Sequence, residues 1–456
     1  MKNRILALLE RTLSQKLGRN KSNELLRLVY EIHRREGLSP EEVLGSEEIR
    51  SVASNSSLGH RDRFSKVKKY LLGRRFPSEY GNPGFNPHFP ELKHAVPGKS
   101  AAAETGGRFI PENIYIEKRA AGTPLARRIT SLFPGIKPVN IRILREYRKE
   151  NGRGPSKRDV FINVRRNGFF KPCPCSTNVL PCGYHIFNLG FGCPYDCSYC
   201  YLQQYSNSPG IVLNANPEDF LGVFDGYIAE TGNRMIRLGT GEFTDSLALD
   251  HITEYSKLLV PFFASKNVFF ELKTKSANID NLKGLEHGGR TVVSWSLNPR
   301  DIIRDEEKGT ASLEERLAAA KECADEGYKI SFHFDPVIHH SGWERNYKEV
   351  VDMLFDTIRS PLWISIGTLR FNRNLKNIIE ERFPGSSYIY GELLPGRDRK
   401  LRYPPALRSE ISRCITRFIR DRNKNTPVYL CMEHTSAWKH ALGSGRVKDI
   451  FRVCSN

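Results

Sequence analysis

Six short apolar runs alternate with amphipathic stretches through the middle of the chain, and this alternation restricts the possible folds more than any other feature. The apolar runs are Tyr184–Leu189, Met235–Leu238, Val268–Leu272, Thr291–Ser296, Lys329–Phe334 and Trp363–Thr368. The stretches with helical spacing are Pro217–Glu230, His251–Ala264, Leu313–Glu326 and Trp343–Ile358. Strands that alternate with helices predict parallel βα units. We therefore predict an α/β fold built as a partial (βα)6 barrel of the TIM type, with its active site at the C-terminal ends of the strands.

Three cysteines lie within eight residues, directly after the first predicted strand. Cys193, Cys197 and Cys200 have the spacing C-x3-C-x2-C. Three thiolates on one loop can bind three irons of a 4Fe–4S cluster and leave the fourth iron open to a substrate or cofactor, whereas a structural cluster usually has four cysteine ligands. The alternative is a zinc site, in which Cys182 or His185 would supply the fourth ligand.

Small and polar residues follow the next three predicted strands. Gly239 and Gly241 would let the backbone approach a ligand closely, and Glu242 beside them could accept hydrogen bonds from an ammonium group. A plain turn is the alternative interpretation of this segment. Lys275 after the third strand and Ser296 at the end of the fourth could bind a carboxylate.

The fifth predicted strand carries His333 and Asp335, which alternation places on one face. These two side chains could bind a metal, act as acid and base, or only make hydrogen bonds. The segment Cys431–His434 resembles a further strand end and is equally open in its role.

A second group of cysteines precedes the predicted barrel. Cys173, Cys175 and Cys182 could bind a second metal or cluster, or they could be ordinary buried thiols. A second cluster would favour radical chemistry on RNA or protein. Cys323, Cys414 and Cys454 stand alone in the sequence, and we expect no function for them.

The net charge of +19 predicts a polyanionic partner, and nucleic acid is the first candidate. Residues 118–171 contain fifteen Lys or Arg against three acidic residues, and residues 397–424 contain ten against three. The alternative is a surface that is merely well solvated.

No apolar stretch reaches the roughly 20 residues of a membrane span, and the N-terminal apolar run is short for a signal peptide. We therefore expect a cytoplasmic protein with reduced cysteines and no membrane contact.

The composition also suggests where the domains begin and end. Residues 1–80 show helical spacing, with Ser39 as the expected N-cap of a helix that starts at Pro40. We assign residues 81–165 to a linker and a basic segment, with a helix over Ile141–Glu150 and a strand over Val160–Val164. Residues 166–380 would form the barrel, and residues 381–456 a basic region that completes it.

The order of several motifs resembles the spore photoproduct lyases, a branch of the radical S-adenosylmethionine enzymes. The motifs are Cys200-Tyr201-Leu202-Gln203, Thr244-Asp245-Ser246, Asp250-His251, Thr274-Lys275, Ser296-Leu297-Asn298, Gly309-Thr310 and Arg316-Leu317-Ala318-Ala319-Ala320. The aromatic residue before the last cysteine of the loop, Tyr199, is typical of the wider family. The resemblance spans residues 183–342, weakens toward residue 443 and does not reach the first 165 residues.

The resemblance implies an enzyme that repairs DNA by reversing a methylene-bridged thymine dimer formed under ultraviolet light. It implies a 4Fe–4S cluster on the three cysteines of the loop, bound S-adenosylmethionine, and a reductant such as a flavodoxin or ferredoxin. Lys275 and Ser296 would contact the carboxylate of the cofactor, while Gly239, Gly241 and Glu242 would lie at its amino group. Tyr199 and Tyr201 match a pair of tyrosines that helps to return a hydrogen atom. Lys400, Arg402 and Tyr403 lie where the lyases have a hairpin that contacts DNA.

One residue departs from the pattern of the lyases. They have a cysteine shortly before the Thr/Ser-Asp stretch that gives a hydrogen atom to the product radical, and this chain has Phe243 there. Either Tyr201 or a cysteine from elsewhere donates the hydrogen atom, or the enzyme acts on RNA, protein or a metabolite instead. A third hypothesis is a zinc-stabilised nucleic-acid-binding protein without catalysis. The sequence leaves the oligomeric state open.

Overall fold

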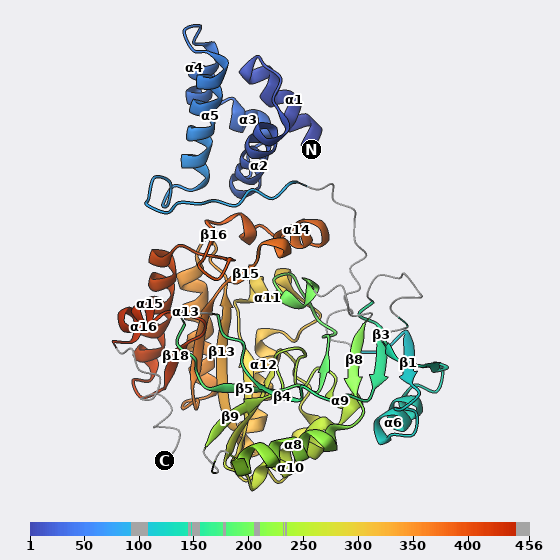
Figure 1. The fold of residues 1–456 in the computed structure, drawn as a ribbon. Helices are drawn as coiled ribbons and strands as arrows, with labels where there is room; N and C mark the ends of the chain where they lie inside the picture. The colour runs from blue at the N-terminus through green and yellow to red at the C-terminus, as the bar shows by residue number, and fades with distance from the viewer. Residues whose placement is uncertain are drawn as a thin grey trace. The chain divides into compact units, whose positions relative to one another are not determined.

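A curved sheet of eight strands forms the centre of the larger of two units in this computed structural model (Figure 1). Across the sheet the strands are β18 (Val428–Leu430), β14 (Ile364–Thr368), β13 (Lys329–Val337), β11 (Thr291–Ser296), β10 (Val268–Thr274), β9 (Ile236–Gly239), β5 (Tyr184–Phe187) and β4 (Phe170–Pro172). All neighbouring pairs are parallel except β4 with β5. The six predicted strands are all present, and the sheet is the predicted partial barrel.

The structure describes residues 1–92, 108–144, 147, 156–176, 179–204, 210–230, 232 and 235–443. One unit comprises residues 1–99 and 369–408, and the other comprises residues 100–368 and 409–456. Cys454 and half of the helix predicted over Ile141–Glu150 lie outside the described residues, and Ile141 itself ends a strand.

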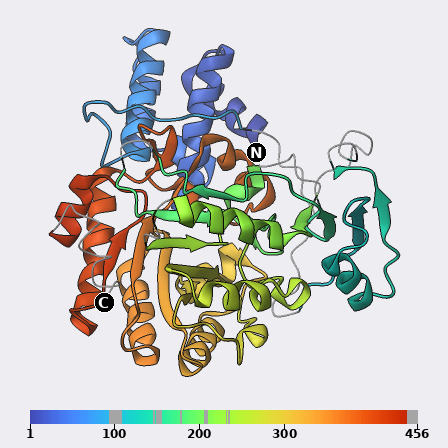
Figure 2. The ribbon, with the colours of Figure 1, turned by 60° about the horizontal axis from the view of Figure 1, so that its bottom comes forward.

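Helices cover the outer side of the curved sheet (Figures 1 and 2). The main ones are α8 (Pro217–Glu230), α10 (Tyr255–Ala264), α12 (Leu313–Asp325) and α13 (Trp343–Thr357). They confirm the four predicted helices, with one difference. The helix expected over His251–Ala264 is split into α9 (Asp250–Thr253) and α10, because Glu254 between them has a φ of 51° and cannot continue a right-handed helix.

A second sheet lies beside the barrel in the same unit, and the sequence did not predict it. Its strands, in order, are β2 (Val139–Ile141), β1 (Asn113–Glu117), β3 (Asp159–Asn163), β8 (Ile211–Asn214) and β6 (Gly190–Phe191). Helix α6 (Pro124–Leu132) packs on it through Leu125 and Ile129. The described residues between 109 and 164 therefore contain three strands and helix α6, where we predicted a linker and a basic segment with one helix and one strand. Short strands of this kind are stabilised by partners that are distant in the sequence, so local patterns reveal them poorly.

The smaller unit confirms the predicted N-terminal helices. They are α1 (Lys2–Leu13), α2 (Arg19–Glu36), α3 (Pro40–Leu44), α4 (Glu47–Ser54) and α5 (His60–Arg75). Ser39 caps α3 in a capping box with Glu42, as its sequence indicates. Further elements come from later in the chain, among them β15 (Arg370–Asn372), α14 (Arg373–Arg382) and the hairpin of β16 (Leu394–Pro395) and β17 (Lys400–Arg402).

A buried ion network joins the early and late segments of this smaller unit. The Glu31 carboxylate of α2 pairs with Arg27, with Arg75 of α5 and with Lys376 of α14. Arg27 also pairs with Glu380 at 2.8 Å. Burial disfavours the charged carboxylate, but the three cations prevail and hold the pKa of Glu31 far below its ordinary value. The N-terminal helices and α14 therefore depend on each other. No helix among the described residues of either unit is long and apolar enough to cross a membrane.

Candidate active site

The three cysteines lie on the loop that connects β6, the edge strand of the second sheet, to the short helix η1 (Tyr201–Gln204). Their loop begins after β6, and its middle forms β7 (Asp196–Cys197), which pairs with β12 (Glu307–Lys308). Gly192 at the start of the loop has a φ of 97°, and its N–H donates to the Phe243 carbonyl at 2.9 Å. An added Cβ there would lie 3.1 Å from the Ile211 Cα, so glycine suits this tight entry to the loop.

The thiols of Cys193, Cys197 and Cys200 are close neighbours in a shielded position. Burial raises the pKa of all three, to about 12 for Cys193. The charges of Cys193 and Cys200 raise the pKa of Cys197 further, whereas the ammonium of Lys275 lowers the pKa of Cys197 and Cys200. Thiolates must therefore be stabilised here by positive charge, and bound iron would supply it.

The donor set fits an iron–sulfur cluster better than a zinc ion. Among the described residues, no three His, Cys, Asp or Glu side chains meet closely enough to hold a single metal ion. A zinc ion needs such a meeting point, and neither Cys182 nor His185 provides a fourth ligand for one. In a 4Fe–4S cluster each thiolate binds a different iron, so its cysteines surround the cluster and need not converge.

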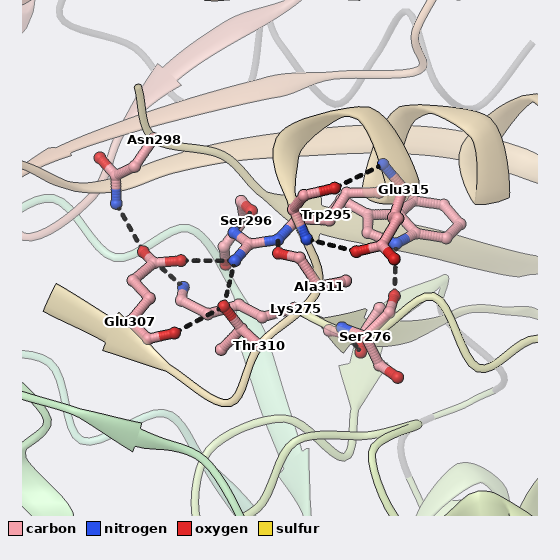
Figure 3. A network of polar contacts seen from close by, with 12 residues as sticks. Lys275, Ser276, Trp295, Ser296, Asn298, Glu307, Thr310, Ala311 and Glu315 are labelled. Carbon is pink, nitrogen blue, oxygen red and sulfur yellow. Dashed lines mark hydrogen bonds and ion pairs between the residues drawn. The ribbon is translucent and has the colours of Figure 1, made fainter. Parts of the chain in front are cut away.

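The Glu307 carboxylate connects the cysteine loop, through Tyr199, to the segments that follow β10 and β11. Figure 3 shows Glu307 beside Asn298 and Lys275 of these two segments. It accepts a hydrogen bond from Asn298 Nδ2 at 2.8 Å, one from the Tyr199 hydroxyl and one from Arg316 Nη2 at 2.6 Å. Lys275 Nζ lies 3.8 Å from Glu307 Oε1. Burial opposes ionisation, but Lys275 and Arg316 hold the pKa of Glu307 at about 2. No sequence pattern indicated Glu307 as a site residue, because it follows a helix and belongs to none of the motifs.

Arg316 connects this carboxylate to the fourth predicted strand. Its Nη1 donates to the Ser296 carbonyl at 2.8 Å, and its Nε donates to the Ala311 carbonyl at 2.9 Å. The Ala311 N–H in turn donates to the Lys275 carbonyl at 3.1 Å. Two of the predicted cofactor-binding residues, Lys275 and Ser296, are therefore brought together at the ends of β10 and β11.

The segment after β9 approaches its neighbours closely, as its glycines suggest. A Cβ on Gly239 would lie 2.1 Å from the Tyr184 hydroxyl, and one on Gly241 would lie 2.9 Å from the Lys273 Cβ. Glu242 follows them, and its Oε2 is buried with no hydrogen bond from any described residue. This oxygen forms an ion pair with Lys171, whose Nζ is 3.7 Å away. Burial raises the pKa of Glu242. A buried carboxylate oxygen without a donor suits an ammonium group of a bound ligand.

Asp245, which the sequence showed only as part of a motif, organises this edge. Its carboxylate accepts from the Leu247 and Ala248 N–H groups at 3.0 and 2.9 Å, from Thr274 Oγ1 at 2.6 Å and from the Lys275 N–H at 2.7 Å. It therefore holds the turn after Glu242 against the end of β10, which fixes the backbone of Lys275.

The two tyrosines that flank Cys200 have different partners. The Tyr199 hydroxyl donates to Glu307, and burial raises the pKa of this phenol. The Tyr201 hydroxyl donates to the Glu242 carbonyl at 2.6 Å, and the Tyr201 side chain is 36% exposed. Tyr201 is thus the more accessible of the two tyrosines. It contacts Glu242, the residue directly before Phe243.

Phe243 occupies a packed position that a small polar side chain could not fill. Its ring stacks on Phe191 with centroids 5.9 Å apart, and Lys171 Nζ lies 4.6 Å from its centroid. The Phe243 side chain has no group that could give up a hydrogen atom, so any donor must come from another residue.

A polar network spans the inner face of the barrel below the site. Glu271 accepts from Arg237, from Ser294 and from His333 Nε2, the last at 2.6 Å. His333 Nδ1 then accepts from the Ser365 hydroxyl at 2.5 Å. Burial holds the pKa of His333 at about 4, so its ring is neutral near pH 7. Three roles were left open for His333. In the structure both ring nitrogens of His333 make hydrogen bonds, which corresponds to the third of these roles.

The residues predicted to contact nucleic acid lie in the smaller unit. Arg402 and Tyr403 are 7% and 2% exposed, and Arg402 pairs with Asp398 at 2.5 Å. Lys400 is half-buried on β17, and Arg397 and Arg399 are exposed at the turn of the hairpin. Burial leaves Arg402 and Tyr403 poorly placed for phosphate or base contact, whereas the arginines of the turn are open to a partner.

Comparisons with known proteins agree on one family. The family model described as spore photoproduct lyase matches residues 109–403. The spore photoproduct lyases of Geobacillus sp. (strain Y412MC61) and Bacillus subtilis (strain 168) are 28% and 27% identical to this chain. Each alignment covers 60% of this chain and 83% of the relative.

Solved structures of spore photoproduct lyase share the fold. A double variant with bound AdoMet and dinucleoside spore photoproduct has a TM-score of 0.61 and 26% identity, and the match covers 72% of this chain and all of the other. A lyase complexed with dinucleoside spore photoproduct has a TM-score of 0.59 and 27% identity, with 71% of this chain and all of the other covered. The family model spans well over half of the 456 residues, and the barrel and its cysteine loop are those expected of radical S-adenosylmethionine enzymes. This chain therefore belongs to the spore photoproduct lyase family.

Proposed function

We propose that this protein uses a 4Fe–4S cluster and S-adenosylmethionine to reverse a methylene-bridged thymine photoproduct in DNA. One observation supports this most strongly. The thiols of Cys193, Cys197 and Cys200, of which Cys197 is buried, adjoin Lys275 and the Glu307 network, at the C-terminal ends of the barrel strands. This is the position where barrel enzymes carry out their chemistry.

The residues at this edge fit both groups. Cys193, Cys197 and Cys200 would hold the cluster. The Glu242 oxygen that lacks a donor would accept from the ammonium of the methionine moiety. Lys275 and Ser296 would bind its carboxylate, because the Lys275 ammonium lies at the end of β10 beside β11. When bound, the two groups together supply a 5′-deoxyadenosyl radical that abstracts hydrogen from the substrate.

The protein side chains orient and insulate this site. Glu307 neutralises Arg316 and holds Lys275 and Tyr199 in place, so the ammonium of Lys275 is already positioned before a ligand arrives. Asp245 fixes the backbone next to Lys275 through four hydrogen bonds. Tyr201, exposed and bonded to the Glu242 carbonyl, would be the tyrosine nearer to the substrate.

The partner that we propose is DNA. A base must leave the duplex stack to enter a barrel of this kind. The positive charge of the chain would bind the phosphates on either side. In the smaller unit we assign this contact to Lys400 with Arg397 and Arg399 of the hairpin turn, since Arg402 is paired inside the unit. A flavodoxin or ferredoxin would supply the electron.

The test is an anaerobic reaction of the reconstituted, reduced protein with S-adenosylmethionine and DNA that carries the spore dimer. We expect 5′-deoxyadenosine formation and restored thymine. The variant Cys197→Ala should lose the cluster absorbance and both products, while Cys414→Ala, in helix α15 (Pro405–Arg422), should keep them. A Cys197→Ala protein that retains a full cluster would contradict the ligand assignment.

The alternative substrates, namely RNA, protein or a metabolite, were suggested by Phe243. The relatives described above are all spore photoproduct lyases and do not favour these alternatives. The same experiment separates the two, because 5′-deoxyadenosine without restored thymine would establish the radical chemistry and exclude the spore dimer as substrate.

A further inference from the structure

Four cysteines outside the cluster loop gather on the inner side of the barrel. Cys173 and Cys175 follow β4, Cys182 precedes β5, and Cys431 follows β18. The thiols of Cys173 and Cys175 are hydrogen-bonded to each other. Cys431 and Cys182 are close enough that their charges raise the pKa of Cys173. All nine cysteines that the structure describes are thiols, with no disulfide among them. Residues from both edges of the sheet therefore form one group, which we call the thiol group.

Backbone contacts explain how the two edges meet. The Cys173 N–H donates to the Tyr184 carbonyl at 2.9 Å and extends the pairing of β4 with β5. Beyond it, the Ser176 N–H donates to Met432 Sδ at 3.3 Å, and the Leu180 N–H donates to the Glu433 carbonyl at 3.1 Å. The segment after β4 thus bridges the opening between the first and last strands, and Cys175 and Cys431 lie on either side of this seam.

The side-chain alternation places Cys173 on the inner face. Phe170 packs outward against Tyr227 of α8, with ring centroids 4.6 Å apart. Successive residues of a strand face opposite sides, so Lys171 and Cys173 face inward. Tyr184, the neighbour of Cys173 on β5, also faces inward, since the Arg237 guanidinium covers its ring at 5.2 Å. Cys173 is half-buried and therefore accessible from the interior of the barrel.

Lys171 connects this face to the active site. It is two residues before Cys173 on the same face, and its Nζ lies 4.6 Å from the centroid of Phe243 and 3.7 Å from the Glu242 carboxylate. Two residues along a strand span about 7 Å. Cys173 is therefore one side-chain position away from the residue that touches Phe243.

The chemistry of the thiol group suits hydrogen-atom transfer, and its geometry does not suit a single metal ion. No three of these cysteines meet closely enough to hold a single metal ion, within the part of the chain that the structure describes. The hydrogen bond to Cys175 and partial burial raise the pKa of Cys173 far above its ordinary value, so the sulfur keeps its hydrogen near neutral pH. An S–H bond is much weaker than the C–H bonds of a nucleoside, and a carbon-centred radical can take its hydrogen atom.

We propose that Cys173 is the hydrogen-atom donor to the product radical, in place of the cysteine that Phe243 replaces. This inference rests on the proposed function. The Cys173 S–H bond breaks and a C–H bond forms on the methylene carbon of the thymine radical, which gives thymine and a sulfur with one unpaired electron. One electron from the flavodoxin- or ferredoxin-type reductant and one proton from solvent then restore the thiol. Cys175, bonded to Cys173, is the neighbour that shares the exchangeable proton.

The experiment is the repair reaction in D2O, followed by mass spectrometry of the thymine and by 5′-deoxyadenosine assay. The thiol exchanges with solvent, so wild-type protein should place one deuterium in the methyl group of the product. Cys173→Ala should still form 5′-deoxyadenosine and bind the cluster, but its yield of deuterated thymine should fall at least tenfold, and altered adducts should accumulate. Cys173→Ser should fail equally, because an O–H bond is too strong to give up its hydrogen atom, whereas a purely structural role would be rescued by serine.

The control is Cys414→Ala, which should match wild-type protein in every product. Deuterated thymine formed at the wild-type level by Cys173→Ala would overturn the proposal, and Tyr201→Phe would then be the variant to lose it. Wild-type protein that forms 5′-deoxyadenosine but no thymine would overturn the proposed substrate, and with it this role for Cys173. The two failures are distinguished by the wild-type reaction alone.

Discussion

At the scale of single residues, Glu307 stands out because four polar side chains of the candidate site contact its carboxylate. It is fully buried, yet Lys275 and Arg316 keep it charged, and Tyr199 and Asn298 occupy its remaining acceptor positions. A buried carboxylate of this kind is stable only with its cations present. The network therefore fixes Lys275 at the end of β10, and ligand affinity should depend on it.

Replacement of Lys275 by alanine should weaken S-adenosylmethionine binding while the cluster stays intact. Loss of one charge-assisted hydrogen bond corresponds to roughly 10- to 100-fold in affinity. Equilibrium binding to the reconstituted protein would measure this effect, with the exposed Lys283→Ala as the control. Unchanged affinity in the Lys275 variant would remove this residue from the cofactor site.

His333 should make the stability of the larger unit depend on pH. Its pKa of about 4 in the folded protein lies below the value of 6.5 for an unperturbed histidine, so the unfolded chain binds a proton more readily. This stabilisation is fully present above pH 6.5 and is lost as the pH falls toward 4, by up to about 3 kcal/mol.

All four tryptophans lie in the larger unit, so their fluorescence reports the unfolding of that unit. The pKa of His88 is also about 4, but His88 lies in the smaller unit, whose unfolding this signal does not follow. Denaturant unfolding between pH 4 and 7 should show the loss in wild-type protein and a flatter profile in His333→Gln. The exposed His440→Gln should follow the wild type. An unchanged slope in His333→Gln would assign the pH dependence to other groups.

At the level of elements, the sequence predicted the strands that form long apolar runs and missed those that do not. Strands such as β11 (Thr291–Ser296) are fully buried and β-branched, so their pattern is visible locally. β4 and β6 are two or three residues long, and they exist only because β5 and β8 lie beside them. The cysteine loop and Lys275 were predictable from spacing and position, whereas Glu307 and Arg237 act through partners that only the fold brings close.

Gly239 shows how tightly the element ends pack, and its substitution should be destabilising. In Gly239→Ala the new Cβ would lie 2.6 Å from the backbone carbonyl of Glu271, which cannot move without disturbing β10. We expect a loss of about 1–3 kcal/mol in the free energy of unfolding. Gly226→Ala in α8 is the matched control, since nothing lies within 4 Å of its Cβ and alanine favours a helix by about 1 kcal/mol. Equal stability of the two variants would mean that β9 and β10 adjust more readily than their packing indicates.

On the scale of the whole molecule, the family resemblance leaves residues 1–92 unexplained. The family model begins at residue 109, and the smaller unit joins helices α1–α5 to the hairpin segment through the Glu31 network. Deletion of the helices would leave Lys376 and Glu380 without their buried partners and would destabilise that segment. Charge-neutralising substitutions on the surface are therefore the better way to test what these helices bind.

Helix α5 offers the clearest surface for such a test. It carries seven Lys or Arg against one Asp. Arg74, Arg75 and Lys68 pair with Glu36, Glu31 and Glu24, respectively, whereas Lys66 and Lys69 are exposed, and no ion pair to them occurs among the described residues. Residues three apart on a helix share a face, so these two lysines can contact the same phosphate backbone.

Lys66→Gln/Lys69→Gln in the full chain should weaken binding to an undamaged 20-bp duplex and reduce the slope of log affinity against log salt by up to about 2, because each lost phosphate contact removes about 0.9 from the slope. Lys68→Gln/Arg74→Gln changes the net charge equally but removes side chains already paired with glutamates, so it should change the slope less. Equal effects of both double variants would show that only the overall charge matters. No effect of either would show that α5 faces solvent in the complex, which would leave DNA binding to the hairpin turn and the larger unit.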